Sequence, residues 1–263
     1  MIVGFQGEPG AFSEEAATTL FGEIEARGFL TFDALVEAVD DGTLPLGLLP
    51  CENSIHGPVT RAYDLLYAHP NVRIVDETVH RIVQTLIGVP GAQLNEIRRI
   101  ESHPVALEQC RRFLRSLHDV EVVPVADTAG AVREVLRVGY RSRAAIGPAA
   151  SARRYGGTIL ADAVQDEAEN YTRFFAIARE GAPRRRLGRA VLAFVLQHQP
   201  GSLHTALGVF AERGLNLRAL VARPLPGRPF EYIFYAELDC PDEPQARSVM
   251  SEVGAETRLL GWY

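Results

Sequence analysis

The sequence predicts an α/β protein with a two-lobed first domain and a smaller βαββαβ second domain. Strand and helix patterns alternate along residues 1–180, and those between about 78 and 165 form a separate series that predicts a middle lobe. A run of Gly, Pro and Arg at 181–189 breaks the pattern and predicts a linker before the second domain, residues 190–263. The chain of 263 residues also exceeds the about 100 to 200 residues of a typical single domain.

The first lobe is predicted to begin with two strand-to-helix units. An apolar run at 2–7 ends in glycine, and residues 13–22 follow it with helical spacing and a serine at the expected cap. A buried-strand pattern at 46–50 leads into the polar loop 51–57, and residues 61–69 have the apolar spacing of a helix. Because strands alternate with helices, we expect the strands to be parallel.

The middle lobe is predicted from strand and helix patterns that continue after residue 72. Apolar residues recur at helical spacing over 103–114, and residues 120–139 combine a strand pattern with a helix pattern. A strand at 171–180 is then expected to return to the first lobe. Its first residues would therefore lie in the crevice between the two lobes.

After the linker the predicted order is strand, helix, strand, strand, helix, strand. This βαββαβ order is that of the split βαβ, ferredoxin-like arrangement. The six elements are expected at 190–196, 202–214, 216–225, 231–238, 244–253 and 257–263.

Composition excludes several classes of protein. Lys and Arg total 27 against 33 Asp and Glu, and the resulting net charge of -6 argues against binding to nucleic acid or an anionic membrane. No window approaches the ~20 apolar residues of a membrane span, and the amino terminus lacks the features of a signal peptide, so we expect a cytoplasmic protein. Cys51, Cys110 and Cys240 lie far apart without C-x-x-C spacing and are expected to be buried, reduced thiols.

Polar residues follow two predicted strands of the first lobe. Ser13 stands at a glycine-rich loop before a helix, where it suits either an anion site or an ordinary helix cap. Asn53 and Ser54 come directly after a buried strand, the position at which open α/β sheets bind ligands. They could donate to a substrate carboxylate or to local backbone groups.

The middle lobe offers a similar set. Ser102 and His103 precede a proline that suits the first turn of a helix, and His103 could shuttle a proton or serve as a surface or capping residue. Asp127 and Thr128 are candidates for another helix cap. The histidines show no metal spacing, and neither G-x-S-x-G nor a P-loop occurs, so no metal site is predicted.

The stretch 170–174 places a hydroxyl, a guanidinium and a ring at the start of a strand. Strand alternation predicts that Thr172 and Phe174 point to one face and Arg173 to the other. The alternative interpretation of this pattern is an ordinary strand with an exposed arginine.

Five stretches occur in order along the chain: "GEPGAFSEEAA", "ENSIHGPV", "ESHPVALEQC", "ADTAGA" and "NYTRF". Together they resemble the prephenate dehydratase family, and the resemblance extends over essentially the whole chain. The segment that follows them, with "PGSLHTAL" and "NLRALVARP", resembles the ACT regulatory domain fused to that enzyme. The resemblance implies a two-lobed, periplasmic-binding-protein-like catalytic domain.

For the first domain the resemblance implies conversion of prephenate to phenylpyruvate, carbon dioxide and water without a cofactor. Thr172 is the implied catalytic residue, and a threonine is easier to defend as a positioning or electrostatic group than as an outright acid. Arg173 would pair with a carboxylate or brace the cleft. The implied substrate-binding residues are Ser13, Asn53, Ser54, Ser102, His103, Thr128, Arg173 and Phe174.

For the second domain the resemblance implies feedback inhibition by L-phenylalanine bound between paired domains, and hence a homodimer or homotetramer. The two family motifs read Gly201-Ser202-Leu203-His204 and Val221-Ala222-Arg223-Pro224 here. Gly201, Ser202, Leu203, Arg223 and Pro224 are the implied ligand-binding residues. Val221 and Ala222 replace the Glu and Ser of the second motif.

Two alternatives remain open at this point. Ala11 stands where many members have Thr, and the "GAFSE" and "DTAGA" stretches are similar to those of arogenate dehydratases, so arogenate is an alternative substrate. Two-lobed α/β proteins also bind amino acids without chemistry. A non-catalytic, amino-acid-sensing protein is therefore the alternative outside the enzymes.

Overall fold

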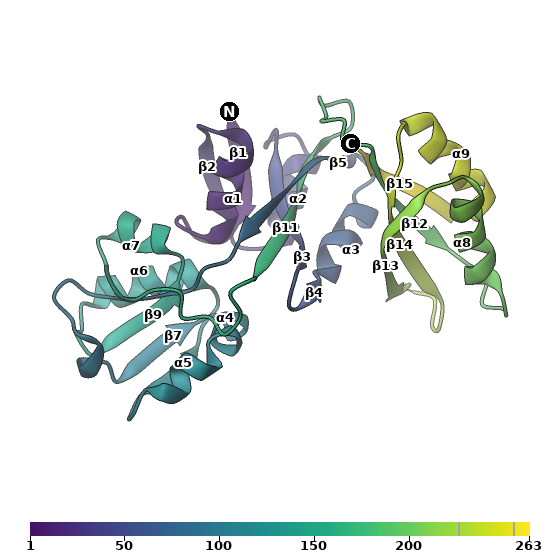
Figure 1. Ribbon diagram of the computed structural model, residues 1–263. Helices are drawn as coiled ribbons and strands as arrows, with labels where there is room; N and C mark the ends of the chain where they lie inside the picture. The colour runs from purple at the N-terminus through teal and green to yellow at the C-terminus, as the bar shows by residue number, and fades with distance from the viewer. Residues whose placement is uncertain (226, 255) are drawn as a thin grey trace. The chain divides into compact units, whose positions relative to one another are not determined.

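The computed structural model describes residues 1–225, 227–254 and 256–263 (Figure 1). Contacts divide them into two compact units. One consists of Met1–Leu35, Glu52–Gly57 and Thr78–Phe174, and the other of Val36–Cys51, Pro58–Glu77 and Phe175–Tyr263.

The amino-terminal residues form an α/β sheet with the strand order β2-β1-β3-β11-β5, and β4 pairs with β3. Strands β1 and β2 are parallel, as predicted for this lobe. The strands are β1 (Ile2–Gln6), β2 (Glu25–Phe29), β3 (Gly47–Asn53), β4 (Gly57–Pro58), β5 (Val72–Arg81) and β11 (Tyr171–Arg179), and the helices are α1 (Phe12–Phe21), α2 (Phe32–Asp40) and α3 (Thr60–Ala68).

The predicted serine cap of the first helix is wrong. The N-cap of α1 is Ala11, and Ser13 lies inside the helix. The backbone N–H of Gly10 donates instead to the carboxylate of Glu14 in the first turn. A carboxylate at a helix N-terminus also interacts favourably with the helix dipole, so Glu14 takes the role predicted for the serine.

The middle residues form a second sheet with the order β10-β6-β9-β7-β8. This sheet is mixed, not all parallel as expected, because β6 runs antiparallel to β9 and β10 while β7 is parallel to β8 and β9. Its elements are β6 (Thr85–Gly88), the short 3-10 helix η1 (Leu94–Glu96), β7 (Arg99–Ser102), α4 (Pro104–Gln109), α5 (Arg111–Ser116), β8 (Glu121–Pro124), α6 (Thr128–Val138), β9 (Arg143–Gly147), α7 (Ala149–Tyr155) and β10 (Thr158–Ala161).

Helices cover both faces of this second sheet. Ile87 and Ala145 pack with residues of α6 and α7, whereas their strand neighbours Leu86, Ala144 and Ile146 pack with residues of α4. This alternation follows from the period of two in a strand. The helix predicted over 103–114 is two short helices, which meet at the non-helical Cys110.

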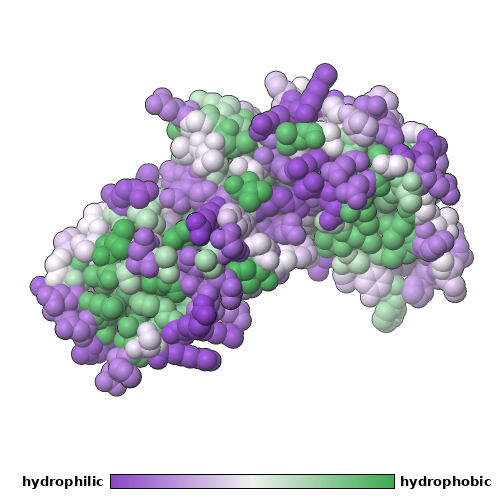
Figure 2. Space-filling view, viewed as in Figure 1, coloured by the Kyte–Doolittle hydropathy of each residue, from purple (hydrophilic) through white to green (hydrophobic). Residues whose placement is uncertain are grey.

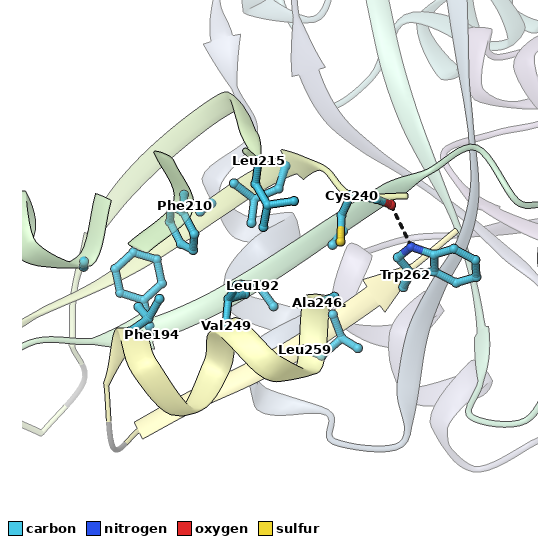
Figure 3. Packing of buried hydrophobic residues seen from close by; sticks show 14 residues of the cluster. Leu192, Phe194, Phe210, Leu215, Cys240, Ala246, Val249, Leu259 and Trp262 are labelled. Atoms are coloured by element: carbon cyan, nitrogen blue, oxygen red, sulfur yellow. Dashed lines mark hydrogen bonds between the residues drawn. The ribbon is translucent and has the colours of Figure 1, made fainter. Parts of the chain in front are cut away.

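The carboxy-terminal residues confirm the predicted βαββαβ order. The sheet order is β13-β14-β12-β15, and the paired strands are antiparallel. Helices α8 and α9 lie on one face, where Phe210 and Val249 join Phe194 and Leu259 in one core (Figures 1 and 3). The elements are β12 (Arg189–Val195), α8 (Ser202–Glu212), β13 (Asn216–Pro224), β14 (Tyr232–Asp239), α9 (Glu243–Val253) and β15 (Glu256–Trp262).

The predicted linker is a loop between β11 and β12, but part of its basic run is engaged. Arg184 forms an ion pair with Glu243, and its guanidinium lies 5.0 Å from the ring centroid of Trp262. Arg185 is more exposed, and its backbone N–H donates to the carbonyl of Val75. The loop therefore packs against its own unit.

Cys51, Cys110 and Cys240 are all buried, as predicted. Burial raises the pKa of the Cys110 thiol to about 12. On the surface of the molecule that Figure 2 presents, hydrophobic residues are interspersed with hydrophilic ones. Within the described ranges, no helix combines the length and apolar character needed to cross a bilayer.

Replacing Gly261 with alanine is expected to destabilise the protein. A Cβ on Gly261 would lie 2.6 Å from the carbonyl oxygen of Ile74, a backbone atom that cannot move away alone. We expect a loss of about 1–3 kcal/mol in the free energy of unfolding, measured by urea denaturation. Gly208→Ala in α8 is the matched control, since its Cβ would meet nothing within 4 Å. Wild-type stability in Gly261→Ala would contradict this packing.

Candidate active site

The candidate site is built where β3 ends and β11 begins, and the side chain of Asn53 joins the two. Its Nδ2 donates to Thr172 Oγ1 at 3.1 Å, to Asn170 Oδ1 at 2.9 Å and to the carbonyl of Tyr171 at 3.0 Å. Its Oδ1 accepts from the backbone N–H groups of Ile55 at 3.1 Å and His56 at 3.0 Å. One carboxamide therefore holds both the loop that follows β3 and the first residues of β11.

The orientation of this amide is fixed by its partners. Backbone N–H groups can only donate and a backbone carbonyl can only accept, so the oxygen of Asn53 must face the loop and its nitrogen must face Thr172. Thr172 Oγ1 is consequently an acceptor in this bond. The hydroxyl proton of Thr172 is left for another acceptor.

Ser54 strengthens the same junction. Its backbone N–H donates to the carbonyl of Tyr171 at 2.8 Å, and its Oγ accepts from the N–H of Tyr171 at 2.9 Å. Asn170, directly before the strand, is fully buried and its carbonyl accepts from Ile82. These bonds fix the backbone that carries Thr172.

Arg173 and Phe174 are placed differently from Thr172. Arg173 forms an ion pair with Glu52, with Nη2 3.0 Å and Nε 3.2 Å from Glu52 Oε2, and only 11% of its side chain is exposed. The alternative of an ordinary exposed arginine is therefore wrong. Phe174 is buried in the core. Arg173 braces the strand from Glu52, and Asn53 holds Thr172.

Two of the predicted middle-lobe residues lie together at the end of β7. The Ser102 hydroxyl is fully buried and donates to the carbonyl of Ile146 at 2.6 Å, so it ties β7 to the neighbouring strand. His103 is the N-cap of α4, and its Nδ1 accepts from the N–H of Val105 at 3.2 Å. The predicted cap and the proline at the first turn are both confirmed.

The predicted cap of α6 is also confirmed, with Asp127 as the N-cap residue. Asp127 Oδ1 accepts from the backbone N–H of Gly130 at 2.5 Å, and Thr128 is the first residue of the helix. Burial lowers the pKa of His103, and the nearby Asp127 carboxylate opposes that shift. His103 and the start of α6 therefore belong to one neighbourhood.

Sequence reasoning missed three residues of this site: His56, Gln109 and Asn170. They stand within quoted stretches, as does Glu52 after the buried strand, but nothing in the pattern assigned any of the four a partner. Gln109 gave no signal, because it occupies a buried position of a helix pattern. It comes within 3.3 Å of His56 Nδ1 through its Nε2.

The family model described as prephenate dehydratase matches residues 3–182. The chain belongs to the prephenate dehydratase family. It is 36% identical over 276 residues to arogenate dehydratase/prephenate dehydratase 2 of Arabidopsis thaliana, covering 99% of this chain and 72% of that protein. Family membership identifies the chain as a dehydratase enzyme.

Two further relatives match almost end to end. A bifunctional N-acyl-homoserine lactone acylase/prephenate dehydratase of Komagataeibacter europaeus is 34% identical over 269 residues, covering 100% of this chain and 95% of that protein. The crystal structure of prephenate dehydratase in complex with L-Phe from Arthrobacter aurescens has a TM-score of 0.90 at 28% identity, covering 100% of this chain and 90% of that one. The likeness therefore includes the carboxy-terminal βαββαβ unit.

The lowered pKa of His103 predicts a contribution to the pH dependence of stability. Because the folded state disfavours the charged ring, this contribution is present above the unfolded-state pKa and is lost as pH falls through the folded-state value. His103→Asn keeps a good N-cap residue without titrating there. We expect a shallower acid loss of unfolding free energy in His103→Asn than in the wild type, measured by urea denaturation across pH. Parallel profiles would contradict it.

Proposed function

We propose that the chain converts prephenate to phenylpyruvate, carbon dioxide and water in phenylalanine biosynthesis. The observation that carries the proposal is the Thr172 hydroxyl held as an acceptor by Asn53, in a member of the prephenate dehydratase family. Residues 1–180 are the proposed catalytic domain, 181–189 the linker and 190–263 an ACT regulatory domain.

The proposed chemistry is redox-neutral and takes up one proton. The bond from the ring to its carboxylate breaks and its electron pair enters the ring, while the bond to the ring hydroxyl breaks on the other side and the ring becomes aromatic. The departing hydroxide must gain a proton to become water. A hydrogen bond from Thr172 to this oxygen stabilises the charge that develops on it in the transition state.

Thr172 is suited to this role by its partner rather than by its own acidity. Accepting from the Asn53 amide polarises the hydroxyl, and hydrogen bonds in such a chain strengthen one another. The junction residues Asn53 and Ser54 also fix the strand, so the hydroxyl is positioned before substrate arrives. His103 and Thr128 are proposed to contact the substrate. The Ser102 hydroxyl is already committed to a carbonyl.

Regulation by L-phenylalanine is proposed at a pocket of about 410 Å³ in the carboxy-terminal unit, at the start of α8. Gly201 and Ser202 line it, together with Arg228, Glu231 and Glu256. Backbone N–H groups in the first turn of a helix suit a ligand carboxylate, and Glu231 and Glu256, which both pair with Arg228, suit its ammonium group. The Ser202 hydroxyl is buried and has no hydrogen-bond partner among the described residues, so a ligand could satisfy it.

The other predicted regulatory residues, Leu203, Arg223 and Pro224, do not line this pocket. Leu203 lines a smaller neighbouring pocket of about 130 Å³ with Ser202. Arg223 is bound to Asp64 of α3, with Nη2 2.8 Å from Oδ2, so contacting a ligand would require it to leave that carboxylate. Pro224 ends β13, an edge strand. Since such an edge can pair with a second copy, we keep the proposal of a homodimer or homotetramer.

Two alternatives follow from the relatives. Several plant relatives are named arogenate dehydratases, which keeps arogenate as an alternative substrate and phenylalanine as its product. The Komagataeibacter europaeus relative is also named an N-acyl-homoserine lactone acylase and aligns with the whole chain, so amide hydrolysis of such lactones is a second candidate activity. Incubation with each compound and detection of its product separates the three.

Thr172→Val is expected to lower the turnover of prephenate about 100- to 1,000-fold, because it removes one preorganised hydrogen-bond donor. The substitution keeps the shape of the side chain, and Asn53 retains Asn170 and Tyr171 as acceptors. Phenylpyruvate formation measures the effect, and Thr172→Ser is the control that keeps the hydroxyl. Near wild-type turnover in Thr172→Val would refute the role of this residue.

Ser202→Ala is expected to raise the L-phenylalanine concentration for half-inhibition about fivefold, since one hydrogen bond to the ligand is lost. Activity without phenylalanine should stay the same. Ser251→Ala, an exposed serine on α9, is the matched control. Equal inhibition of the wild type and Ser202→Ala would place the ligand elsewhere, and no inhibition of the wild type would remove the proposed regulation.

A further inference from the structure

A short polar chain runs from Asn53 through His56 to Gln109. His56 Nδ1 lies 3.2 Å from Asn53 Oδ1 and 3.3 Å from Gln109 Nε2, while His56 Nε2 lies 3.9 Å from Glu108 Oε2. The imidazole thus stands between the amide that holds Thr172 and the last turn of α4. It comes from the loop after β3, whereas Gln109 and Glu108 come from the middle sheet's own helix.

We propose that His56 is a positioning residue whose proton on Nδ1 holds Asn53 in place for Thr172. With that proton present, Nδ1 donates to Asn53 Oδ1 as a third donor beside two backbone N–H groups. All three bonds pull the amide oxygen toward the loop and leave Nδ2 facing Thr172. The inference deepens the proposed dehydratase function and rests on it.

The neighbours of the ring compete for its two nitrogens. The Glu108 carboxylate faces Nε2 and favours a proton there, and the Gln109 amide hydrogen faces Nδ1 and favours a lone pair there. Glu108 itself pairs with the Arg111 guanidinium at 2.5 Å. Asn53 and Gln109 are neutral. A hydrogen on Nδ1 therefore meets one acceptor, Asn53 Oδ1, and one competing donor, Gln109 Nε2.

Without that hydrogen, the lone pair of Nδ1 faces the lone pairs of Asn53 Oδ1 at 3.2 Å, and the contact becomes repulsive. Gln109 then donates to the ring. Its own orientation is set by Gln84 Nε2 at 3.2 Å, and Gln84 Oε1 is buried without a partner in the described ranges. This pair has no anchor at its far end, so it can follow the imidazole while Asn53 cannot reverse.

Two variants distinguish the effect of the Nδ1 proton from the effect of the rest of the His56 side chain. His56→Asn places a permanent amide donor near the position of Nδ1, and His56→Leu removes the donor. His118→Asn is the matched control, because His118 is exposed and belongs to the same unit. We expect His56→Asn to keep most of the wild-type kcat for prephenate, and His56→Leu to lose about fivefold in kcat with little change in KM.

An NMR experiment tests the effect of His56 on Asn53 without measuring turnover. The side-chain amide resonances of Asn53 should shift in His56→Leu, and should stay close to their wild-type positions in His118→Asn. Unchanged Asn53 amide resonances or a wild-type kcat in His56→Leu would overturn the inference. If the wild type turns over no prephenate while the resonances still shift in His56→Leu, the proposed function fails and the contact between His56 and Asn53 stands.

Discussion

The carboxamide of Asn53 is the constraint on which the site depends. A side-chain amide has one acceptor end and one donor end, and here backbone groups occupy both: N–H groups of the loop on one side and the Tyr171 carbonyl on the other. Reversing the group would set donors against donors and acceptors against acceptors. Thr172 consequently meets a donor, and its own hydrogen remains available for a ligand.

Strand β11 is held in place by the same kind of polar pairing. Residues that share a strand alternate in direction, so the end of β3 sends Glu52 and Asn53 to different partners on β11, Arg173 and Thr172. An ion pair with a largely buried arginine and a fixed amide thus bind adjacent residues of the same two strands. Such a junction keeps the Thr172 hydroxyl in one position, which is the condition for stabilising charge that appears only in the transition state.

Much of this could be predicted from the sequence, because periodicity and local chemistry act over a few residues. The βαββαβ order, the Asp127 cap and the polar residues after β3 are local features, and the structure contains them. The partners of those residues are not local. Asn53 and Asn170 are 117 positions apart, and His56 and Gln109 are 53 apart, so no pattern of spacing pairs them. The mixed second sheet escaped prediction for the same reason.

The surroundings of two arginines were also predicted wrongly, because their carboxylate partners lie far away along the chain. Arg184 and Arg173 have the appearance of exposed cations in the sequence, but each has a carboxylate from a distant segment, and the Ser13 cap gave way to a carboxylate one residue further along. A charged residue in the sequence shows which bonds it can form, but not which partner it has in the fold. A buried polar group that lacks a partner is therefore more informative about function.

The carboxy-terminal sheet shows what such pairing implies for regulation. Beneath it, Tyr63 of α3 donates to the buried carboxylate of Glu237 at 2.5 Å, and Asp64 accepts from Arg223 and Tyr235. Leaving the buried Glu237 carboxylate without its donor would be costly, and the Asp64 bonds add to the ties between these strands and α3. A ligand that changed the spacing of β13 and β14 would therefore also act on α3, within the same unit.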